Sequence, residues 1–189
     1  MDGKILAKTE KYIKCDTLLL SIGLIPENEL SRSAGITLDA TTRGPCVDNL
    51  MQTEKKGFFA GGNVVQVYDL VDYVSEDSYI AGFNASRYAQ GKLNGPYREI
   101  RVEPGRSIRS IVPQKIRILD LKTPKYILSL RVAKPFKEVK LNIIADGKTI
   151  GTIKRPYAVP SEMIRLDIPK YIDDISSIKN LRISLEEVS

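Results

Sequence analysis

The spacing of apolar residues changes in character at Asn94-Gly95-Pro96, and this change constrains the fold of the 189-residue chain more than any other feature. After Pro96, apolar and polar residues alternate in short stretches, which is the period of β-strands with one buried face. Eight stretches are expected to form strands: 99–102, 107–112, 115–119, 126–132, 139–145, 148–155, 163–168 and 181–185. Short strands at such regular spacing predict an all-β sandwich over residues 95–189.

One hairpin of this sandwich is expected at Asp146-Gly147, which separates two of the predicted strands. A two-residue hairpin turn needs positive φ angles, and Asp-Gly is one of the pairs that adopts them most readily. In a preceding strand, one face is expected to carry only apolar and aromatic side chains, namely Tyr126, Leu128, Leu130 and Val132.

The first 94 residues mix strand and helix signals, which is typical of an α/β segment. Strands are predicted at 4–8, 11–14, 17–22 and 57–60, and helices at 27–34 and 74–90. Gly35 and Gly91 are expected to end the helices, because glycine adopts the left-handed conformation that often follows a helix. Ser75 is the predicted N-cap of the second helix.

Several classes of site are excluded by composition. The chain has no histidine, which excludes imidazole zinc sites and Ser-His-Asp hydrolysis. Cys15 and Cys46 form no CxxC motif, so we interpret them as packing and loop residues in a reducing cytosol and not as a redox pair. No run of 18 apolar residues is present, so neither a membrane span nor a signal sequence is expected.

Charge is divided unevenly between the two halves. Residues 1–94 hold 10 Lys and Arg against 12 Asp and Glu, whereas residues 95–189 hold 19 against 11. Six basic residues near the start of the second half raise the hypothesis of a nucleic-acid stripe: Arg98, Arg101, Arg106, Arg109, Lys115 and Arg117. Sparse aromatic residues and interrupting acids favour solvated strand faces, and hence no nucleic-acid partner.

A cluster of four acidic residues in the first half has two interpretations. Asp69, Asp72, Glu76 and Asp77 lie close together in the sequence and suggest a metal cluster. The favoured alternative is a solvated loop followed by acids at a helix N-terminus, where the helix dipole stabilises negative charge. We therefore expect no metal site.

Two strings in the first half carry a family resemblance. Residues 15–28 read CDTLLLSIGLIPEN, and residues 53–63 read TEKKGFFAGGN. Their order, their separation and the helix predicted after the second string resemble the pyridine nucleotide-disulphide oxidoreductase family, in its thioredoxin-reductase-like group. Members of this group have an FAD domain with an inserted NAD(P) domain. Within the group, the sequence of these strings is most similar to a branch that lacks the redox-active CxxC.

The resemblance implies a cofactor-binding role for the end of the second string. In the family this strand ends in an acid that accepts a hydrogen bond from the ribityl chain of FAD, and Asn63 stands at that position. An amide oxygen can still accept this bond, with the loss of charge assistance worth roughly 1 kcal/mol. Gly61 and Gly62 would let the cofactor approach the backbone, and Ser75 and Glu76 would lie near the flavin ring. The alternative is that Asn63 is only a turn residue after two glycines.

The resemblance covers residues 1–93 and corresponds to the C-terminal portion of such an enzyme. No G-x-G-x-x-G occurs in the sequence, so the usual phosphate sites for FAD and NAD(P) are absent from it. The expected fold is therefore a partial α/β FAD-binding segment, residues 1–94, followed by the β-sandwich. Met1 is expected to be the edge of a truncated or split protein.

The function that the resemblance implies is FAD-dependent oxidation of NAD(P)H by the completed enzyme, with the isolated chain inactive and its catalytic residues unknown. A non-enzymatic module that docks a partner through the basic sandwich is the alternative. Without the missing N-terminal region, four side chains are expected to be exposed: Leu18, Leu20, Phe58 and Phe59. The first half would then be held by self-association, by a companion flavoprotein subunit or by the sandwich.

Overall fold

The computed structural model describes residues 6–21, 23–119, 126–171 and 175–188. Its strands are β1 (Arg98–Pro104), β2 (Ile108–Val112), β3 (Lys115–Ile118), β4 (Ile127–Val132), β5 (Phe136–Ala145), β6 (Lys148–Ala158), β7 (Ile164–Asp167) and β8 (Asn180–Glu187). Each of the eight strands predicted after Pro96 is thus confirmed, with boundaries that differ by a few residues.

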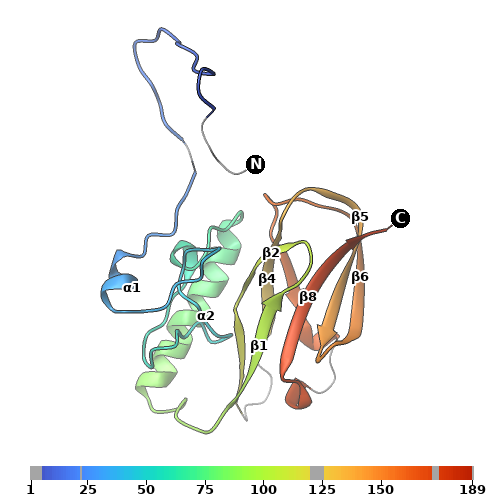
Figure 1. Ribbon diagram of the computed structural model, residues 1–189. Coiled ribbons are helices and arrows are strands. Elements are labelled where there is room, and N and C mark those ends of the chain that lie inside the picture. The colour runs from blue at the N-terminus through green and yellow to red at the C-terminus, as the bar shows by residue number, and fades with distance from the viewer. Residues whose placement is uncertain (1–5, 22, 120–125, 172–174, 189) are drawn as a thin grey trace.

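The strands form two sheets that pack face to face (Figure 1). One sheet has the order β3-β1-β8-β5-β6, and the other has the order β2-β4-β7. Neighbouring strands are antiparallel except for β1 and β8, which run parallel with Val102 opposite Leu181. A single apolar cluster lies between the sheets, with members from both that include Ile100, Leu128, Leu130, Leu141, Leu166 and Leu185. This arrangement is the sandwich that the alternating pattern predicts.

Strand β4 shows how this sandwich is covered on its outer side. Tyr126 and the alternate residues of β4 point into the core as expected and are buried. Ser129 and Arg131 occupy the opposite face, yet Ser129 is also buried. They are covered because residues of the first half pack over the three-stranded sheet, with α2 (Val71–Ala89) running beside it (Figure 1).

The Asp146-Gly147 hairpin is confirmed between β5 and β6. Asp146 has φ 45° and Gly147 has φ 85°, and Ala145 pairs with Lys148 across the turn. The Asp146 carboxylate also accepts hydrogen bonds from the backbone N–H groups of Lys179 and Asn180. This turn therefore ties the hairpin to the start of β8.

Both predicted helices of the first half are present. The first is α1 (Glu29–Ser33), and short 3₁₀ helices occur at η1 (Gly62–Val64), η2 (Ile168–Lys170) and η3 (Ile175–Ser177). Gly35 follows α1 with φ 66° and Gly91 follows α2 with φ 71°, as expected. No helix in the described part of the chain has the length and apolar character needed to cross a membrane.

The N-terminus of α2 differs from the prediction. The helix begins at Val71, after Leu70, and not at Val74. Ser75 therefore lies in the second turn, where its hydroxyl donates to the Val71 carbonyl at 3.1 Å. The prediction that Ser75 is the N-cap is wrong, because the three residues before Val74 extend the helix by almost one turn.

The strands predicted in the first half do not form in the described residues. Residues 6–8, 11–14 and 17–21 hold no strand, and Phe59 forms only an isolated bridge with Gln52. Positions 4, 5 and 22 of these predictions lie outside the described residues. A strand needs a neighbour for its backbone hydrogen bonds, and no other described segment pairs with these stretches.

Residues 6–21 run away from the rest of the molecule (Figure 1). Leu18, Leu19 and Leu20 are 71%, 90% and 71% exposed. Exposure of Leu18, Leu20 and Phe58 was expected and is confirmed, but the expectation for Phe59 is wrong. The Phe59 ring packs edge-on against Tyr88, with 6.0 Å between the ring centroids.

Candidate cofactor site

Gly61 and Gly62 lie against α2, but the space beside each glycine differs. A Cβ atom on Gly61 would lie 2.8 Å from the Ser78 Cα, so only glycine allows the chain to cross the helix this closely. Gly62 has φ 73° and begins η1, and a Cβ there would meet only the tips of Ser78 and Val74 at 3.2 and 3.4 Å. The helix thus fills the space beside Gly61, whereas the surroundings of Gly62 are less crowded.

Asn63 follows the pair within η1 and is half-buried. Its Oδ1 accepts a hydrogen bond from the backbone N–H of Tyr68 at 3.2 Å, which closes the loop between these residues. An amide oxygen has two lone pairs, so Oδ1 retains the capacity to accept one further hydrogen bond. Asn63 therefore has a role as a turn residue and also fits a ribityl hydroxyl.

The two site residues predicted on α2 lie on its exposed surface. Ser75 is engaged with its own helix, as described above. Glu76 forms an ion pair with Arg165 of β7, with 3.1 Å between Oε2 and Nη1. The structure thus brings Gly61 and Gly62 to the N-terminal half of α2 but directs Glu76 toward the sandwich. Of the predicted site residues, Gly62 and Asn63 thus lie together beside the N-terminal half of α2.

Asn28 is a buried polar residue whose role sequence reasoning missed. It is 2% exposed, and its Nδ2 donates to the carbonyls of Arg43 at 3.0 Å and Val64 at 2.8 Å. Its Oδ1 accepts from the Ser31 hydroxyl at 2.8 Å. Asn28 therefore joins the end of the first family-like string to η1, which follows the second. Its position near the start of the helix predicted over 27–34 was the one available signal.

Gly44 makes a second close contact next to these hydrogen bonds. A Cβ atom at this position would lie 1.8 Å from the Val65 carbonyl oxygen and 2.6 Å from the Val65 Cα. The two backbone segments thus touch directly, and both acceptors of Asn28 are adjacent to this contact. The geometry holds the Gly62–Asn63 turn in place against the chain that follows Pro26.

The N-terminal part of the chain is similar to a known protein family. Residues 2–78 match the family described as pyridine nucleotide-disulphide oxidoreductase. The match covers less than half of the chain. We call residues 2–78 the oxidoreductase segment. The resemblance based on the two strings is thereby confirmed.

Curated relatives match the same region. A nitric oxide reductase FlRd-NAD(+) reductase of Escherichia coli O127:H6 is 36% identical over 58 residues, which are 31% of this chain and 15% of that protein. The protein of the same name from Escherichia coli SMS-3-5 is 37% identical over 68 residues, which are 35% of this chain and 17% of that protein. The match therefore spans about one sixth of these relatives. No solved structure matches the chain significantly.

The oxidoreductase segment meets the sandwich through buried arginines, of which Arg117 of β3 is the most enclosed. Arg117 is 7% exposed, and its Nη1 donates to Gln52 Oε1 and lies 3.8 Å from Asp48 Oδ2. Its guanidinium stacks over the Tyr97 ring at 3.8 Å. The interpretation of this arginine as part of a solvated strand face is wrong, because the segment covers the edge strand β3. Arg101, Arg106 and Arg109 are exposed, as expected.

Two more arginines reach the segment from the three-stranded sheet. Arg131 of β4 donates to the Val67 carbonyl at 3.0 Å and lies 3.5 Å from Asp69 Oδ1. Arg165 of β7 pairs with Asp77 at 3.0 Å in addition to Glu76. Three of the four clustered acids thus pair with arginine. The solvated interpretation is wrong for Asp77, which is buried, whereas Asp69 and Glu76 are exposed as expected. The acidic half and the basic half of the chain are complementary at this junction.

Burial at the junction alters the acidity of three groups. Burial raises the pKa of Asp48 to about 6, although backbone N–H groups of Leu50 and Gln52 and the Arg117 guanidinium oppose the shift. Burial and the neighbouring Asp77 carboxylate raise the pKa of Tyr68, whose hydroxyl donates to Asp77. Burial also raises the pKa of the Cys46 thiol, which favours the unreactive protonated form.

The raised pKa of Asp48 predicts a specific pH dependence of stability. Between pH 3.8, which is the pKa of Asp48 in the unfolded chain, and about pH 6, the folded protein retains a proton on Asp48 that the unfolded chain releases. The contribution of Asp48 to stability is therefore complete below the unfolded pKa and is lost as the pH rises through the folded pKa, by roughly 3 kcal/mol in total. Urea unfolding at several pH values should show this loss in the wild type and not in Asp48→Asn. Parallel pH profiles for the two proteins would contradict the assignment.

Proposed function

We propose that the first half of the chain supplies the ribityl and ring side of a flavin site in an FAD-dependent NAD(P)H oxidoreductase. The observation that carries the proposal is the position of the Gly62–Asn63 turn beside the N-terminal half of α2, within a segment of the oxidoreductase family. When bound, FAD supplies hydride and electron transfer, which the side chains of this polypeptide cannot carry out themselves.

The residues of the turn have separate roles in this proposal. Gly62 keeps the backbone accessible, and Asn63 Oδ1 accepts a hydrogen bond from a ribityl hydroxyl while its first lone pair holds Tyr68. The first turn of α2, which begins at Val71, directs unpaired backbone N–H groups and the positive end of the helix dipole toward the flavin ring. The segment thus orients the cofactor and favours negative charge at its ring.

The other side of the cofactor requires residues that this sequence does not contain. It holds no G-x-G-x-x-G for the pyrophosphate. We propose that an N-terminal region or a companion flavoprotein subunit supplies this motif, and that residues 17–21 pair with its sheet. The exposure of Leu18, Leu19 and Leu20 supports this, since an apolar run of this kind is typical of a strand buried on both faces.

The proposed pairing of residues 17–21 predicts a change in hydrogen exchange. In the isolated 189-residue chain, their backbone amides should exchange within seconds, because they form no ladder in the described structure. In the native assembly the same amides should be protected by at least about a hundredfold. Mass spectrometry of peptides from this region would measure both states. Equal exchange in the two states would show that the strand does not form there.

The relatives' name supports electron transfer that involves a pyridine nucleotide. They are named as reductases between NAD(+) and FlRd. We infer that the completed enzyme passes electrons between NAD(P)H and a partner protein or small acceptor. The interaction-module alternative is supported by the sandwich itself, whose exposed Arg101, Arg106 and Arg109 remain available to an acidic partner. A module of this kind would bind its partner without any flavin in the assembly.

The flavin content of the native assembly distinguishes these functions. The chain would be recovered from its source cells through a C-terminal tag, and its visible flavin absorbance would be compared with that of the isolated 189-residue chain. We expect about one flavin per chain in the native assembly and a colourless isolated chain that does not oxidise NAD(P)H. A native assembly without flavin would contradict the enzyme and favour the module.

Substitutions at Asn63 add a control to this test. Asn63→Ala should weaken flavin retention about tenfold, because one acceptor is lost and the loop to Tyr68 loosens. Asn63→Asp should retain flavin at least as well, since it restores charge assistance. Ser86→Ala, on the exposed side of α2 far along the helix, should leave retention unchanged. Equal retention in all variants would remove Asn63 from the site.

A further inference from the structure

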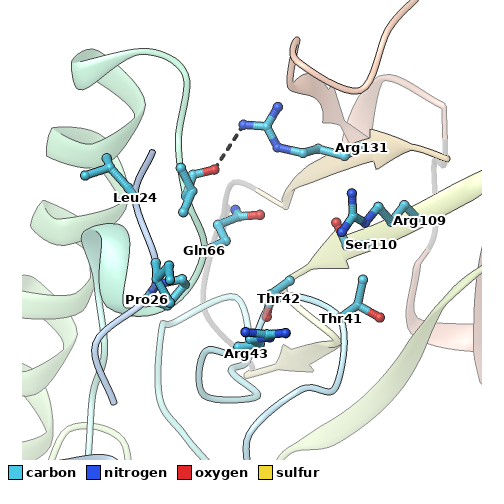
Figure 2. Close-up of a pocket in the computed structure, with 11 residues that line it drawn as sticks. Leu24, Pro26, Thr41, Thr42, Arg43, Gln66, Arg109, Ser110 and Arg131 are labelled. Atoms are coloured by element: carbon cyan, nitrogen blue, oxygen red, sulfur yellow. Dashed lines mark hydrogen bonds between the residues drawn. The ribbon is translucent and has the colours of Figure 1, made fainter. Parts of the chain in front are cut away.

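A cleft of about 270 Å³ lies at the junction between the oxidoreductase segment and the three-stranded sheet (Figure 2). One wall is formed by Leu24 and Pro26, and the opposite wall by side chains of β2 and β4. The polar side chains that line it include Arg43, Thr42, Gln66, Arg109, Ser110 and Arg131. These residues come from both halves of the chain, so the cleft exists only when the two halves are docked.

The charge of the cleft lining is entirely positive. Three guanidinium groups line it, and its lining contains no carboxylate. Arg131 is partly neutralised by Asp69 outside the lining, whereas Arg43 and Arg109 are exposed and form no ion pair with any described residue. The cleft therefore presents two uncompensated arginines around a hollow, which attracts an anion.

A buried amide points to the same kind of ligand. Gln66 is 3% exposed, and its side chain projects into the cleft between Leu24 and Ser110 (Figure 2). Its Nε2 has no acceptor at hydrogen-bond geometry, although the Tyr68 hydroxyl lies near it. A buried donor without an acceptor is costly and rare in proteins. An acceptor that enters from the cleft would satisfy it.

We propose that this cleft binds the phosphate group of a small phosphorylated molecule. Arg43 and Arg109 would pair with phosphate oxygens, Gln66 Nε2 would donate to a third, and the hydroxyls of Thr42 and Ser110 would complete the shell. A carboxylate group, by contrast, presents only two oxygens and one charge to the arginines, which is fewer than this donor set can engage. The wall of Leu24 and Pro26 would contact the organic part of the ligand. This site uses none of the residues assigned to the flavin and does not depend on that assignment.

Isothermal titration of the 189-residue chain with inorganic phosphate, and with succinate at equal ionic strength, tests the proposal. We expect saturable phosphate binding that Arg109→Gln weakens by about tenfold or more. Arg106→Gln provides the matched control, since Arg106 is also exposed on the sandwich but lies outside the cleft, and it should bind as the wild type does.

Gln66→Leu separates a ligand-binding role from a structural one. Removal of an unpaired buried donor should leave the melting temperature unchanged or higher, while phosphate binding falls by about fivefold or more. The proposal would be overturned by the absence of saturable phosphate binding at low salt, by equal binding of succinate, or by equal losses in Arg106→Gln and Arg109→Gln. Unchanged phosphate binding in Gln66→Leu would also overturn it.

Discussion

Substitution of Arg117 by methionine should lower the free energy of unfolding by about 3–5 kcal/mol at pH 7. At this pH the buried Asp48 carboxylate is ionised, and the substitution removes the only cation described as pairing with it. Gln52 Oε1 also loses its donor, and Tyr97 loses the stacked guanidinium. Methionine fills similar space but replaces none of these interactions. Chemical denaturation monitored by circular dichroism would measure the change.

Arg101→Met serves as the matched control for Arg117→Met. Arg101 lies on the neighbouring strand β1 with its side chain 73% exposed, and its contact with Glu103 is long at 3.9 Å. Loss of such an exposed pair should change the free energy of unfolding by less than about 1 kcal/mol. Similar losses for the two variants would show that the junction between segment and sandwich is not held by Arg117.

Substitution of Gly44 by alanine should destabilise the protein by about 3 kcal/mol, at the upper end of typical overpacking penalties. The added methyl group would overlap the Val65 carbonyl, so the backbones on either side must separate. That separation also breaks the hydrogen bonds of Asn28 to Arg43 and Val64, and leaves its amide group buried. Thermal and urea unfolding would measure the loss.

The same substitution at Gly82 has the opposite expected result. Gly82 lies within α2 in a helical conformation, and a Cβ atom there would meet nothing within 4 Å. Gly82→Ala should therefore stabilise the protein by about 0.5–1 kcal/mol through helix propensity. If Gly44→Ala were as well tolerated, the close contact between the backbones at Gly44 and Val65 would be wrong.

The sandwich was predictable because its signals are local. Alternating residues fix which face of a strand is buried, and Asp146-Gly147 fixes one turn, so all eight strands follow from short stretches of sequence. The order of the strands was not predictable, because the parallel pairing of β1 with β8 joins residues nearly eighty positions apart. Nothing near Val102 or Leu181 in the sequence indicates this pairing.

In the first half of the chain, burial depends on contacts between distant residues, which local sequence patterns do not predict. The run Thr17–Ile22 has the composition of a buried strand, yet residues 17–21 are exposed because composition alone does not supply a neighbouring strand. Arg117 looked like one basic residue among six, and its burial depends on Asp48 and Gln52, which are distant in the sequence. The sequence predicts that the glycine pair lets a cofactor approach the backbone, whereas the close approach that the structure shows at Gly61 is that of helix α2.

A structure of the native, flavin-bearing assembly would show where the flavin lies relative to this segment. We predict that the ribityl chain contacts Gly62 and Asn63 and that the flavin ring lies against the N-terminus of α2 at Val71, within hydrogen-bond reach of its backbone N–H groups. A structure in which the ring lies away from this helix terminus, or in which no flavin contacts Asn63, would contradict it.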